Sequence, residues 1–313
     1  MTKNKIFSFL LFIFFINLSI SKDIHPKAGT TGMAFLKLPV GARSIAMGEA
    51  FTSVVSDVNS IYWNSAGLVY LKSGFASFTH NEWLEDIRYG FIGYAEPLEQ
   101  GKSSVGISFT YLSSGNILKT TLEDPSGEYS GIYTAKDMAI SFAYARAFNP
   151  NFSIGLNTKY LYQQIDLEKA NGLACDLGIL YKDLYQDKIN LSAVIQNIGQ
   201  MSDFIEGKQI LPTKYILGCS YKIFNTQKNS LNLVVDIIKP IDNYFKINLG
   251  TEYWFHQLVA LRLGYKINSD LNALTCGGGL RIGIEEKNIY IDYAFVGYKL
   301  FNNTHRFSLG FEF

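Results

Sequence analysis

Apolar and polar residues alternate with a period of two along most of the chain after residue 72. Between residues 259 and 266, every second residue is apolar, and the residues between them are small or charged: Val259, Leu261, Leu263 and Tyr265 alternate with Ala260, Arg262, Gly264 and Lys266. Because successive side chains of a strand point to opposite faces, this pattern predicts strands with one apolar and one polar face.

Fourteen segments carry the strand pattern. They cover residues 73–80, 88–96, 104–112, 137–146, 152–162, 172–182, 188–196, 214–222, 230–238, 244–254, 259–266, 274–283, 288–295 and 304–313. Most have about the nine or ten residues that a tilted strand needs to cross a bilayer. Lipid does not tolerate an open sheet edge, so the pattern predicts an all-β protein, a 14-stranded antiparallel transmembrane β-barrel. In the alternative, a soluble sandwich, the apolar faces would form an internal core.

The connections between the predicted strands agree with this topology. The longest, residues 113–136 and 197–213, follow the third and the seventh predicted strands. If the first strand starts at the periplasmic side, both connections lie outside the cell, where barrels of the outer membrane carry their long loops. Turn residues such as Asn149-Pro150-Asn151 then fall on the inner side.

Residues 29–68 lack the alternation and are rich in Gly, Ala and Ser. We expect a folded insert with two short helices, one from Ile45 to Val55 capped by Ser44. A second would begin at Asp57 or Asn59 and end at Gly67. Residues 22–71 are therefore interpreted as an N-terminal helical hatch inside the lumen, and 72–313 as the barrel. The alternative is a two-helix cap on a soluble domain.

The first 21 residues have the features of a secretion signal. Lys3 and Lys5 precede an apolar run, residues 6–16, and residues 19–21 offer a small-x-small cleavage site. We expect Sec-dependent export with cleavage near Ser21; the alternative is an uncleaved anchor helix.

The composition narrows the classes of function. Aromatic residues make up 15% of the chain and charged residues only 18%, which suits a lipid-facing barrel. With 28 basic against 27 acidic residues, no basic field indicates nucleic acid. The three Cys are too widely spaced for a disulfide or zinc framework, and common catalytic motifs are missing. We therefore expect no enzyme, cofactor or metal; Glu123, Asp124 and Glu128 suggest a solvated acidic loop rather than a calcium site.

The lumen-facing phase of the strands carries charged residues: Asp176, Asp236, Glu252, Arg262, Asp292 and Glu312. Arg43 is the hatch residue that we expect to bind one of these carboxylates, because a guanidinium can hold a carboxylate with two hydrogen bonds. Alternatively, Arg43 caps a local turn or faces water. Five apolar hatch residues line a hydrophobic path or form the core of the hatch itself: Phe35, Leu36, Met47, Phe51 and Trp63.

The last predicted strand ends on an aromatic residue. Four apolar residues share its outward face: Phe307, Leu309, Phe311 and Phe313. This end resembles the C-terminal signal by which outer-membrane barrels are recognised, with Ser308 where a Gly is expected, and implies the barrel-assembly machinery as a partner.

The N-terminal residues resemble the signature of the PorV/PorQ family, a branch of the FadL-like outer-membrane barrels. The matching hatch positions are Gly29, Gly32, Phe35, Leu36, Gly41, Ala42, Arg43, Met47, Gly48, Trp63, Asn64, Ala66 and Gly67. Family members have Asn-Pro-Ala-Gly where this chain has Asn64-Ser65-Ala66-Gly67. The resemblance implies fourteen strands and a hatch, in the outer membrane of a diderm bacterium.

Three functions remain open. The resemblance to PorV/PorQ implies a role in protein export, with type IX secretion subunits or cargo C-terminal domains as partners at the loops 113–136 and 197–213. The FadL-like kinship implies passive uptake of hydrophobic small molecules. The third possibility is a soluble, secreted β-protein that binds a partner.

Overall fold

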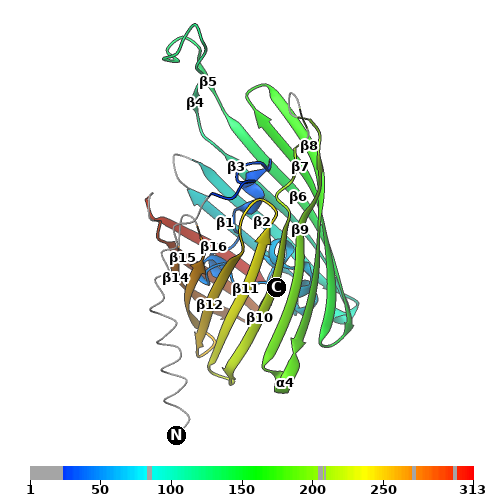
Figure 1. Ribbon diagram of the computed structural model, residues 1–313. Helices are drawn as coiled ribbons and strands as arrows, with labels where there is room; N and C mark the ends of the chain where they lie inside the picture. Colours follow the sequence, from blue (N-terminus) through cyan, green and yellow to red (C-terminus); the bar gives the residue numbers. More distant parts are fainter. Residues whose placement is uncertain (1–23, 83–86, 204–206, 208, 270–272, 299–301) are drawn as a thin grey trace.

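The computed structural model describes residues 24–313 except 83–86, 204–206, 208, 270–272 and 299–301 (Figure 1). The predicted signal peptide, residues 1–21, lies outside the described residues. Among the described residues, no helix has the length and apolar character needed to span a bilayer.

Fourteen antiparallel strands form a closed barrel, in which each strand pairs with its neighbours in the chain and β1 pairs with β16 (Figure 1). The barrel strands are β1 (Phe75–Glu82), β2 (Arg88–Leu98), β3 (Ser103–Ser113), β6 (Ala135–Asn149), β7 (Phe152–Ile165), β8 (Glu168–Asp183), β9 (Ile189–Met201), β10 (Lys214–Asn225), β11 (Ser230–Pro240), β12 (Lys246–Phe255), β13 (Val259–Ile267), β14 (Leu274–Ile284), β15 (Lys287–Val296) and β16 (Thr304–Glu312). The predicted fold class and strand number are confirmed.

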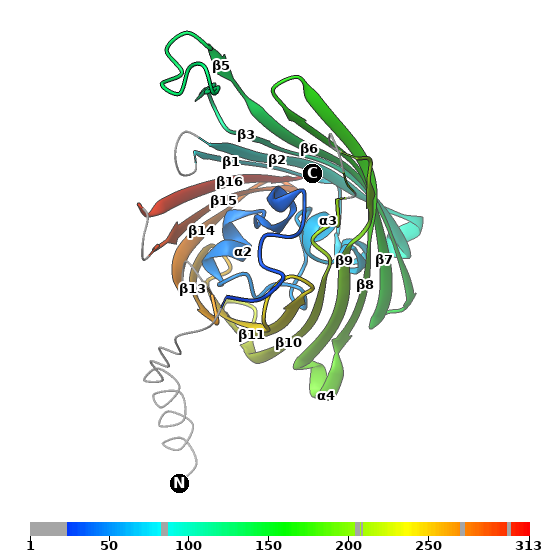
Figure 2. The same cartoon turned by 45° about the horizontal axis from the view of Figure 1, so that its top comes forward.

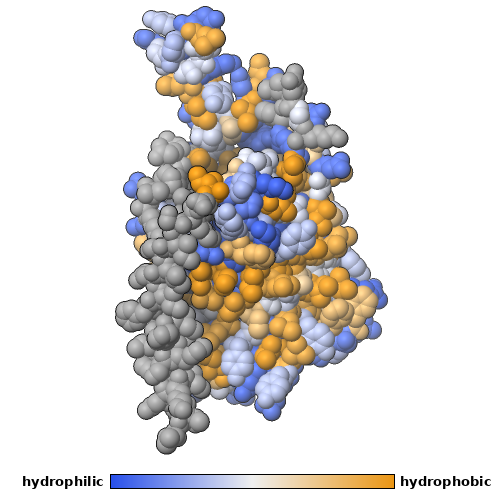
Figure 3. Space-filling model, in the orientation of Figure 1, coloured by the Kyte–Doolittle hydropathy of each residue, from blue (hydrophilic) through white to orange (hydrophobic). Residues whose placement is uncertain are grey.

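Most apolar residues of the strands point outward. Along β13, exposed and buried residues alternate without exception, with Leu261 60% and Arg262 2% exposed. Orange, hydrophobic residues gather over the barrel wall in Figure 3, and hydrophilic ones gather toward its ends. A soluble protein would bury these residues, so the soluble alternative is wrong; this wall fits a lipid bilayer.

The barrel wall has an uneven height. Strands β6, β7 and β8 have 15, 14 and 16 residues, whereas β13 and β16 on the opposite side have 9 each. Above β3 and β6 projects a small hairpin of β4 (Ile117–Leu118) and β5 (Ile132–Tyr133) (Figure 1). The end with this hairpin is called the outer end below, and the opposite end, with the short helix α4 (Leu184–Asp187), the inner end.

Residues 24–71, called the N-terminal segment below, lie inside the ring of strands (Figure 2). They form η1 (Ala34–Lys37), α2 (Ala42–Ala46), α3 (Ser60–Trp63) and η2 (Ser65–Tyr70); a further short helix, η3 (Glu99–Gly101), connects β2 to β3. In place of the two predicted helices, the segment has four shorter ones.

The predicted start of the second helix is confirmed: α3 begins after Asn59, whose backbone N–H donates to the carboxylate of Asp57 at 2.8 Å. The predicted caps at Ser44 and Gly67 are wrong. Helix α2 follows Gly41, and Ser44 lies within it and donates a hydrogen bond back to the carbonyl oxygen of Val40. Gly67 does not end a helix but lies within η2, packed against Val55. Contacts with the barrel wall, rather than local capping, determine the conformation of the segment.

Candidate functional site

Glycines of the barrel wall allow the backbone of the N-terminal segment to approach it closely. On β12 and β13, Gly250 and Gly264 face Met47 and Gly48, and a Cβ atom at Gly264 would collide with the backbone of Gly48. Gly48 has a φ of +66°, a left-handed conformation that glycine adopts without strain. The segment therefore turns directly against the wall at this point.

Glycines of other strands play the same part around the lumen. A Cβ atom at four of them would collide with the N-terminal segment: Gly106 with Ile61, Gly155 with Ser65, Gly178 with Asn64 and Gly218 with Thr52. At Gly93 it would lie 3.1 Å from Val58, a tight contact. Together with Gly250 and Gly264, these seven positions are called the glycine ring below. The sequence analysis missed this ring, although each of its members falls in the lumen-facing phase of a strand.

Hydrogen bonds reinforce these contacts. The side-chain amide of Asn64 donates to the backbone carbonyl oxygens of Thr52 at 3.1 Å and of Ile179 on β8 at 3.2 Å. Its side-chain oxygen, Oδ1, accepts from the backbone N–H of Ala66. Gln196 on β9 donates to the backbone of Trp63. The segment is thus held by backbone and side-chain groups on several strands.

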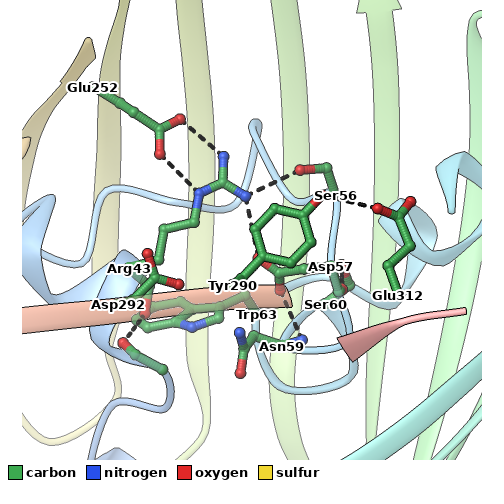
Figure 4. Close-up of polar contacts among 12 residues, drawn as sticks. Arg43, Ser56, Asp57, Asn59, Ser60, Trp63, Glu252, Tyr290, Asp292 and Glu312 are labelled. Atoms are coloured by element: carbon green, nitrogen blue, oxygen red, sulfur yellow. Dashed lines mark hydrogen bonds and ion pairs between the residues drawn. The ribbon is translucent and has the colours of Figure 1, made fainter. Parts of the chain in front are cut away.

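Arg43 is bound to the barrel wall by a bidentate ion pair, in which two of its nitrogen atoms donate to one carboxylate. Its Nε and Nη2 atoms donate to the two carboxylate oxygens of Glu252 at 2.8 and 2.9 Å (Figure 4). Its Nη1 atom donates to Ser56 and to Asp57 within the segment. Burial disfavours the charge of Arg43, but the contact with Glu252 outweighs this effect and raises its pKa, so the guanidinium stays protonated.

The charges continue along the wall beyond Glu252. Arg262 donates to Glu252 at 2.8 Å and to Asp292 at 2.6 Å, so that the four residues alternate in sign. Such alternation satisfies most of the buried donors and acceptors. Of the carboxylates considered as partners of Arg43, only Glu252 is in direct contact with it; Asp292 is reached through Arg262.

The remaining predicted charges lie elsewhere in the lumen. Asp236 accepts hydrogen bonds from the backbone N–H groups of Phe51 and Thr52. Asp176 forms an ion pair with Lys159 at 2.7 Å. Glu312 accepts from Tyr290 near the inner end. Asp236 therefore binds the backbone of the N-terminal segment, whereas Glu312 binds the wall only.

The apolar residues of the segment form a packed cluster. Phe35, Leu36, Met47, Phe51 and Trp63 are all buried and belong to one cluster, which also includes Tyr89 and Phe91 of β2. The indole of Trp63 donates to the carbonyl oxygen of Val40 at 3.0 Å. These residues therefore form the core of the N-terminal segment rather than the lining of an open hydrophobic path.

The other predicted positions of the N-terminal signature lie above and below this cluster. Gly29 and Gly32 are near the outer end, where Gly32 donates to the carbonyl oxygen of Ile210. Gly41 precedes α2 with a φ of +82°, and the backbone N–H of Ala42 donates to the hydroxyl of Ser308 on β16 at 2.8 Å. The signature residues are thus spread over the depth of the lumen.

Two cavities lie on opposite sides of the N-terminal segment. The inner cavity has a volume of about 200 Å³ and is lined by Arg43 together with residues at the inner strand ends, such as Trp254 and Glu312. The outer cavity has a volume of about 240 Å³ and is lined by residues at the outer strand ends, such as Lys246 and Val296. The segment separates the two.

Two further predicted features lie outside the lumen. Phe307, Leu309 and Phe311 on β16, and Phe313 directly after it, have exposed side chains, 39% to 59%. In the connection 113–136, Asp124 accepts hydrogen bonds from the backbone of Tyr129 and Ser130 and so organises its own loop. Within the described ranges, no three His, Cys, Asp or Glu residues are grouped in a way that could hold a metal ion.

Comparison with known families identifies the chain. Residues 21–242 match the family model described as type IX secretion system protein PorV. The chain belongs to the PorV family. Its membership places the barrel in the outer membrane, as a type IX secretion protein. A search of the curated proteins finds no match by sequence.

Solved structures of similar fold are hydrocarbon channels and transporters of the FadL type. The monoaromatic hydrocarbon channel CymD superimposes with a TM-score of 0.64 at 12% identity, over 88% of this chain and 97% of its own. The Pseudomonas putida toluene transporter TodX has a TM-score of 0.59 at 12% identity, over 87% and 96%. A Pseudomonas aeruginosa FadL homologue has 0.57 at 10% identity, over 87% and 97%. At these identities, the likeness establishes the fold alone.

Proposed function

We propose that this PorV-family protein is a closed, non-catalytic docking barrel of the type IX secretion system. In this proposal, residues 1–21 direct Sec-dependent export and are removed, residues 22–71 are a hatch, and residues 72–313 form the barrel. Secretion-system subunits or cargo C-terminal domains bind its outer loops, and the cargo does not pass through its lumen.

The attachment of the hatch on all sides carries this proposal. The glycine ring brings the segment against β2, β3, β7, β8, β10, β12 and β13, and Arg43 and Asp236 add polar contacts. Opening a path wide enough for a polypeptide would require these contacts to break together. Such a barrel suits binding at its surface better than conduction.

The outer end offers a surface for partners. Within the connection 113–136, Leu122 is 96% and Tyr129 85% exposed, and Leu118 on β4 also faces solvent. Apolar side chains that project into water frequently mark sites of protein interaction. The acidic residues Glu123 and Glu128 beside them favour a partner with basic and apolar groups.

Uptake of hydrophobic compounds is the second candidate, and one feature favours it. An apolar recess of about 480 Å³ lies in the outward face of the wall, lined by residues such as Phe142, Leu173 and Ile198. It lies beside the shift in register between β8 and β9. Behind it, however, the ion pair of Lys159 with Asp176 occupies the lumen side.

Affinity purification of the tagged protein from native membranes, followed by mass spectrometry, tests the proposal. We expect secretion-system subunits or cargo C-terminal domains to co-purify. A variant in which a Gly-Ser linker replaces residues 116–133 should lose the partners that the hairpin binds. Tyr185→Ser in α4, at the inner end, is the matched control and should retain them. Recovery of the barrel alone, with hydrophobic compounds bound, would contradict the export role and favour uptake.

A further inference from the structure

The inner cavity is formed jointly by the N-terminal segment and the barrel wall. Asn59 comes from the N-terminal segment, Trp254 from β12 and Arg262 from β13. The lining also includes Gln257, in the turn between β12 and β13, and the exposed Ser56, so the cavity opens at the inner end. Because the long loops of an outer-membrane barrel lie outside the cell, we take this end to face the periplasm.

The charged side chains around this cavity balance one another. Three guanidinium groups and three carboxylates line it: Arg43, Arg262, Arg281, Asp57, Asp292 and Glu312. Four of them form two ion pairs, Arg43 with Asp57 and Arg262 with Asp292, and the other two bond to opposite ends of one side-chain amide on β15. Both paired arginines also bond to Glu252, which does not line the cavity. An ion of either sign would compete with these bonds, so the lining favours a neutral ligand.

Arg262 has a buried donor that the protein does not use. The side chain is fully buried, and its Nε and Nη1 atoms donate to Glu252 and Asp292. Its Nη2 atom has no acceptor among the described residues. Gly279 on β14 makes room for this group, because a Cβ atom there would lie 2.9 Å from Nη2. Buried donors without a partner are rare in folded proteins, and a ligand or ordered water commonly supplies the acceptor.

Asn59 has an acceptor that is also unused. It directly precedes α3, a position where an Asn side chain commonly caps the helix, but its side chain makes no capping hydrogen bond. The side chain instead packs against Gly41, where a Cβ atom would lie 2.9 Å from its amide carbon. Asn59 is only 6% exposed, and its Oδ1 atom has no donor within the described part of the chain. In Figure 4, it lies in one group with Asp57, Tyr290 and Glu312, which line the same cavity.

The two unused groups define the polar part of a ligand. The donor requires an acceptor and the acceptor requires a donor, and a secondary amide offers both, on its C=O and N–H groups. Ser56 and Gln257 add groups that can bond to hydroxyls, while Phe75, Trp254 and Tyr290 give the cavity an aromatic side. The volume of about 200 Å³ is below the range of sites for drug-sized ligands, so a single ring fits better than a longer chain. These features together suit an N-acetylated sugar.

We propose that the inner cavity binds one N-acetylated sugar unit on the periplasmic side. Its amide carbonyl accepts from Nη2 of Arg262, its amide N–H donates to Oδ1 of Asn59, and its hydroxyls bond to Ser56 and Gln257. Two sources share this chemistry beneath the outer membrane: the glycan strands of the cell wall and a free sugar released from them. The proposal goes beyond the docking function, because the outer loops would bind partners even if the inner cavity were empty.

Saturation-transfer NMR on the full-length mature protein in lipid nanodiscs tests the proposal, with empty nanodiscs as the background. The probes are N-acetylglucosamine, glucose, which has a hydroxyl in place of the acetamido group, and N-acetylglycinamide, which has the amide but no sugar ring. We expect N-acetylglucosamine to bind roughly fivefold more tightly than either of the others, because each lacks one part of the contacts. Equal affinity of N-acetylglucosamine and either of the other probes would overturn the proposal.

Variants distinguish this cavity from other polar surfaces at the inner end. Asn59→Ala removes the acceptor without removing a helix cap, and N-acetylglucosamine should bind roughly fivefold more weakly. Asn225→Ala, at the exposed inner end of β10, is the matched control and should leave binding unchanged. The heat-dependent shift of the folded barrel on electrophoresis shows that each variant is assembled. Ser56→Tyr, at an exposed lining position, should block the cavity and abolish binding even if Asn59→Ala does not assemble.

Equal affinity of Asn59→Ala and Asn225→Ala for N-acetylglucosamine, or unchanged binding in Ser56→Tyr, would overturn the proposal. Sedimentation of the protein with isolated cell-wall sacculi then identifies the source of the sugar. Co-sedimentation that is reduced by added N-acetylglucosamine and by Asn59→Ala identifies the glycan strands, whereas binding of the sugar without co-sedimentation identifies the free sugar. Neither result affects the co-purification of secretion partners, so this proposal and the docking function fail separately.

Discussion

At the scale of single residues, the glycines of the barrel wall matter as much as its charged residues. Gly264 permits the backbone of Gly48 to lie directly on β13. A strand interior normally disfavours glycine, because glycine has no side chain to pack and loses more conformational freedom than other residues. At position 264, the lack of a Cβ atom is what allows the N-terminal segment to pack against the strand.

Gly264→Ala tests this role. Its methyl group would collide with backbone atoms of the N-terminal segment, which cannot rotate away as a side chain can, so we expect a loss of about 1–3 kcal/mol of stability. Gly283→Ala on β14 is the matched control, because its nearest neighbour would be the side-chain oxygen of Asn288 at 3.7 Å. Thermal unfolding followed by circular dichroism measures both variants. Equal unfolding temperatures would show that the segment does not depend on close approach at Gly264.

The sequence could suggest Arg43 but not its partner. Five lumen-facing carboxylates were open as candidates, and only the position of α2 against β12 selects Glu252. That position is set by contacts such as Gly250 with Met47, which join residues about two hundred positions apart and leave no local pattern. The same reason explains why the glycine ring was not recognised.

At the scale of elements, strands and helices differed in how well the sequence predicted them. The strands were found because alternation is a local property that outward-facing lipid enforces over every barrel strand. The first helix of the N-terminal segment was placed wrongly, since Ser44 has the preferences of a cap but bonds backward from within α2. The start of α3 after Asn59 was found correctly. The ends of β6 and β8 were also missed, because both strands continue beyond the predicted bounds.

The hairpin of β4 and β5 depends on one carboxylate. Asp124 accepts hydrogen bonds from the hydroxyls of Ser130 and Ser126 and from the backbone of Tyr129 and Ser130. These bonds, with that from Ser130 foremost, lower the pKa of Asp124 to about 2. A carboxyl group with a lowered pKa stabilises the loop above its ordinary pKa and loses this effect as the pH falls toward 2.

Asp124→Ala should loosen this loop at neutral pH. We expect the amides of Tyr129 and Ser130 to exchange with deuterium faster, because each loses its acceptor. Glu123→Ala, at the exposed neighbouring position, should not change their exchange. In the wild type, protection should persist at pH 4 and disappear near pH 2. Unchanged exchange in Asp124→Ala would mean that other contacts hold the loop.

At the scale of the whole molecule, the sequence predicted that the sheet closes into a barrel, but it did not predict the uneven height of the barrel wall. Membrane-length strands must form a closed barrel in lipid, because an open edge would leave backbone groups unpaired, and the pairing of β1 with β16 completes this barrel. The greater height of β6 to β8 was not predictable, because alternation continues in the same way where a strand leaves the bilayer. The uneven height gives the outer end a raised side, which carries the hairpin (Figure 1).

A closed lumen should make the protein nearly impermeable. In liposome swelling assays, we expect wild-type protein to admit small sugars slowly, and Arg43→Ala to admit them faster because the bidentate ion pair with Glu252 and the bond to Asp57 are lost. Arg281→Ala is the control, since Arg281 lines the same inner cavity but bonds to Asn288 on the wall. If Arg43→Ala does not increase the rate of sugar entry, Arg43 does not help to close the lumen. High permeability of the wild-type protein would contradict a closed barrel.

The seam between β1 and β16 has a consequence for biogenesis. Ser308 on the last strand contacts Thr79 on the first strand and also accepts a hydrogen bond from Ala42 of α2. Residues 24–71 leave the ribosome before any strand, yet the compartment that holds them is completed only when the final strand arrives. We therefore expect the sheet to fold around the N-terminal segment while its edges are still open, and the pairing of β16 with β1 to come last.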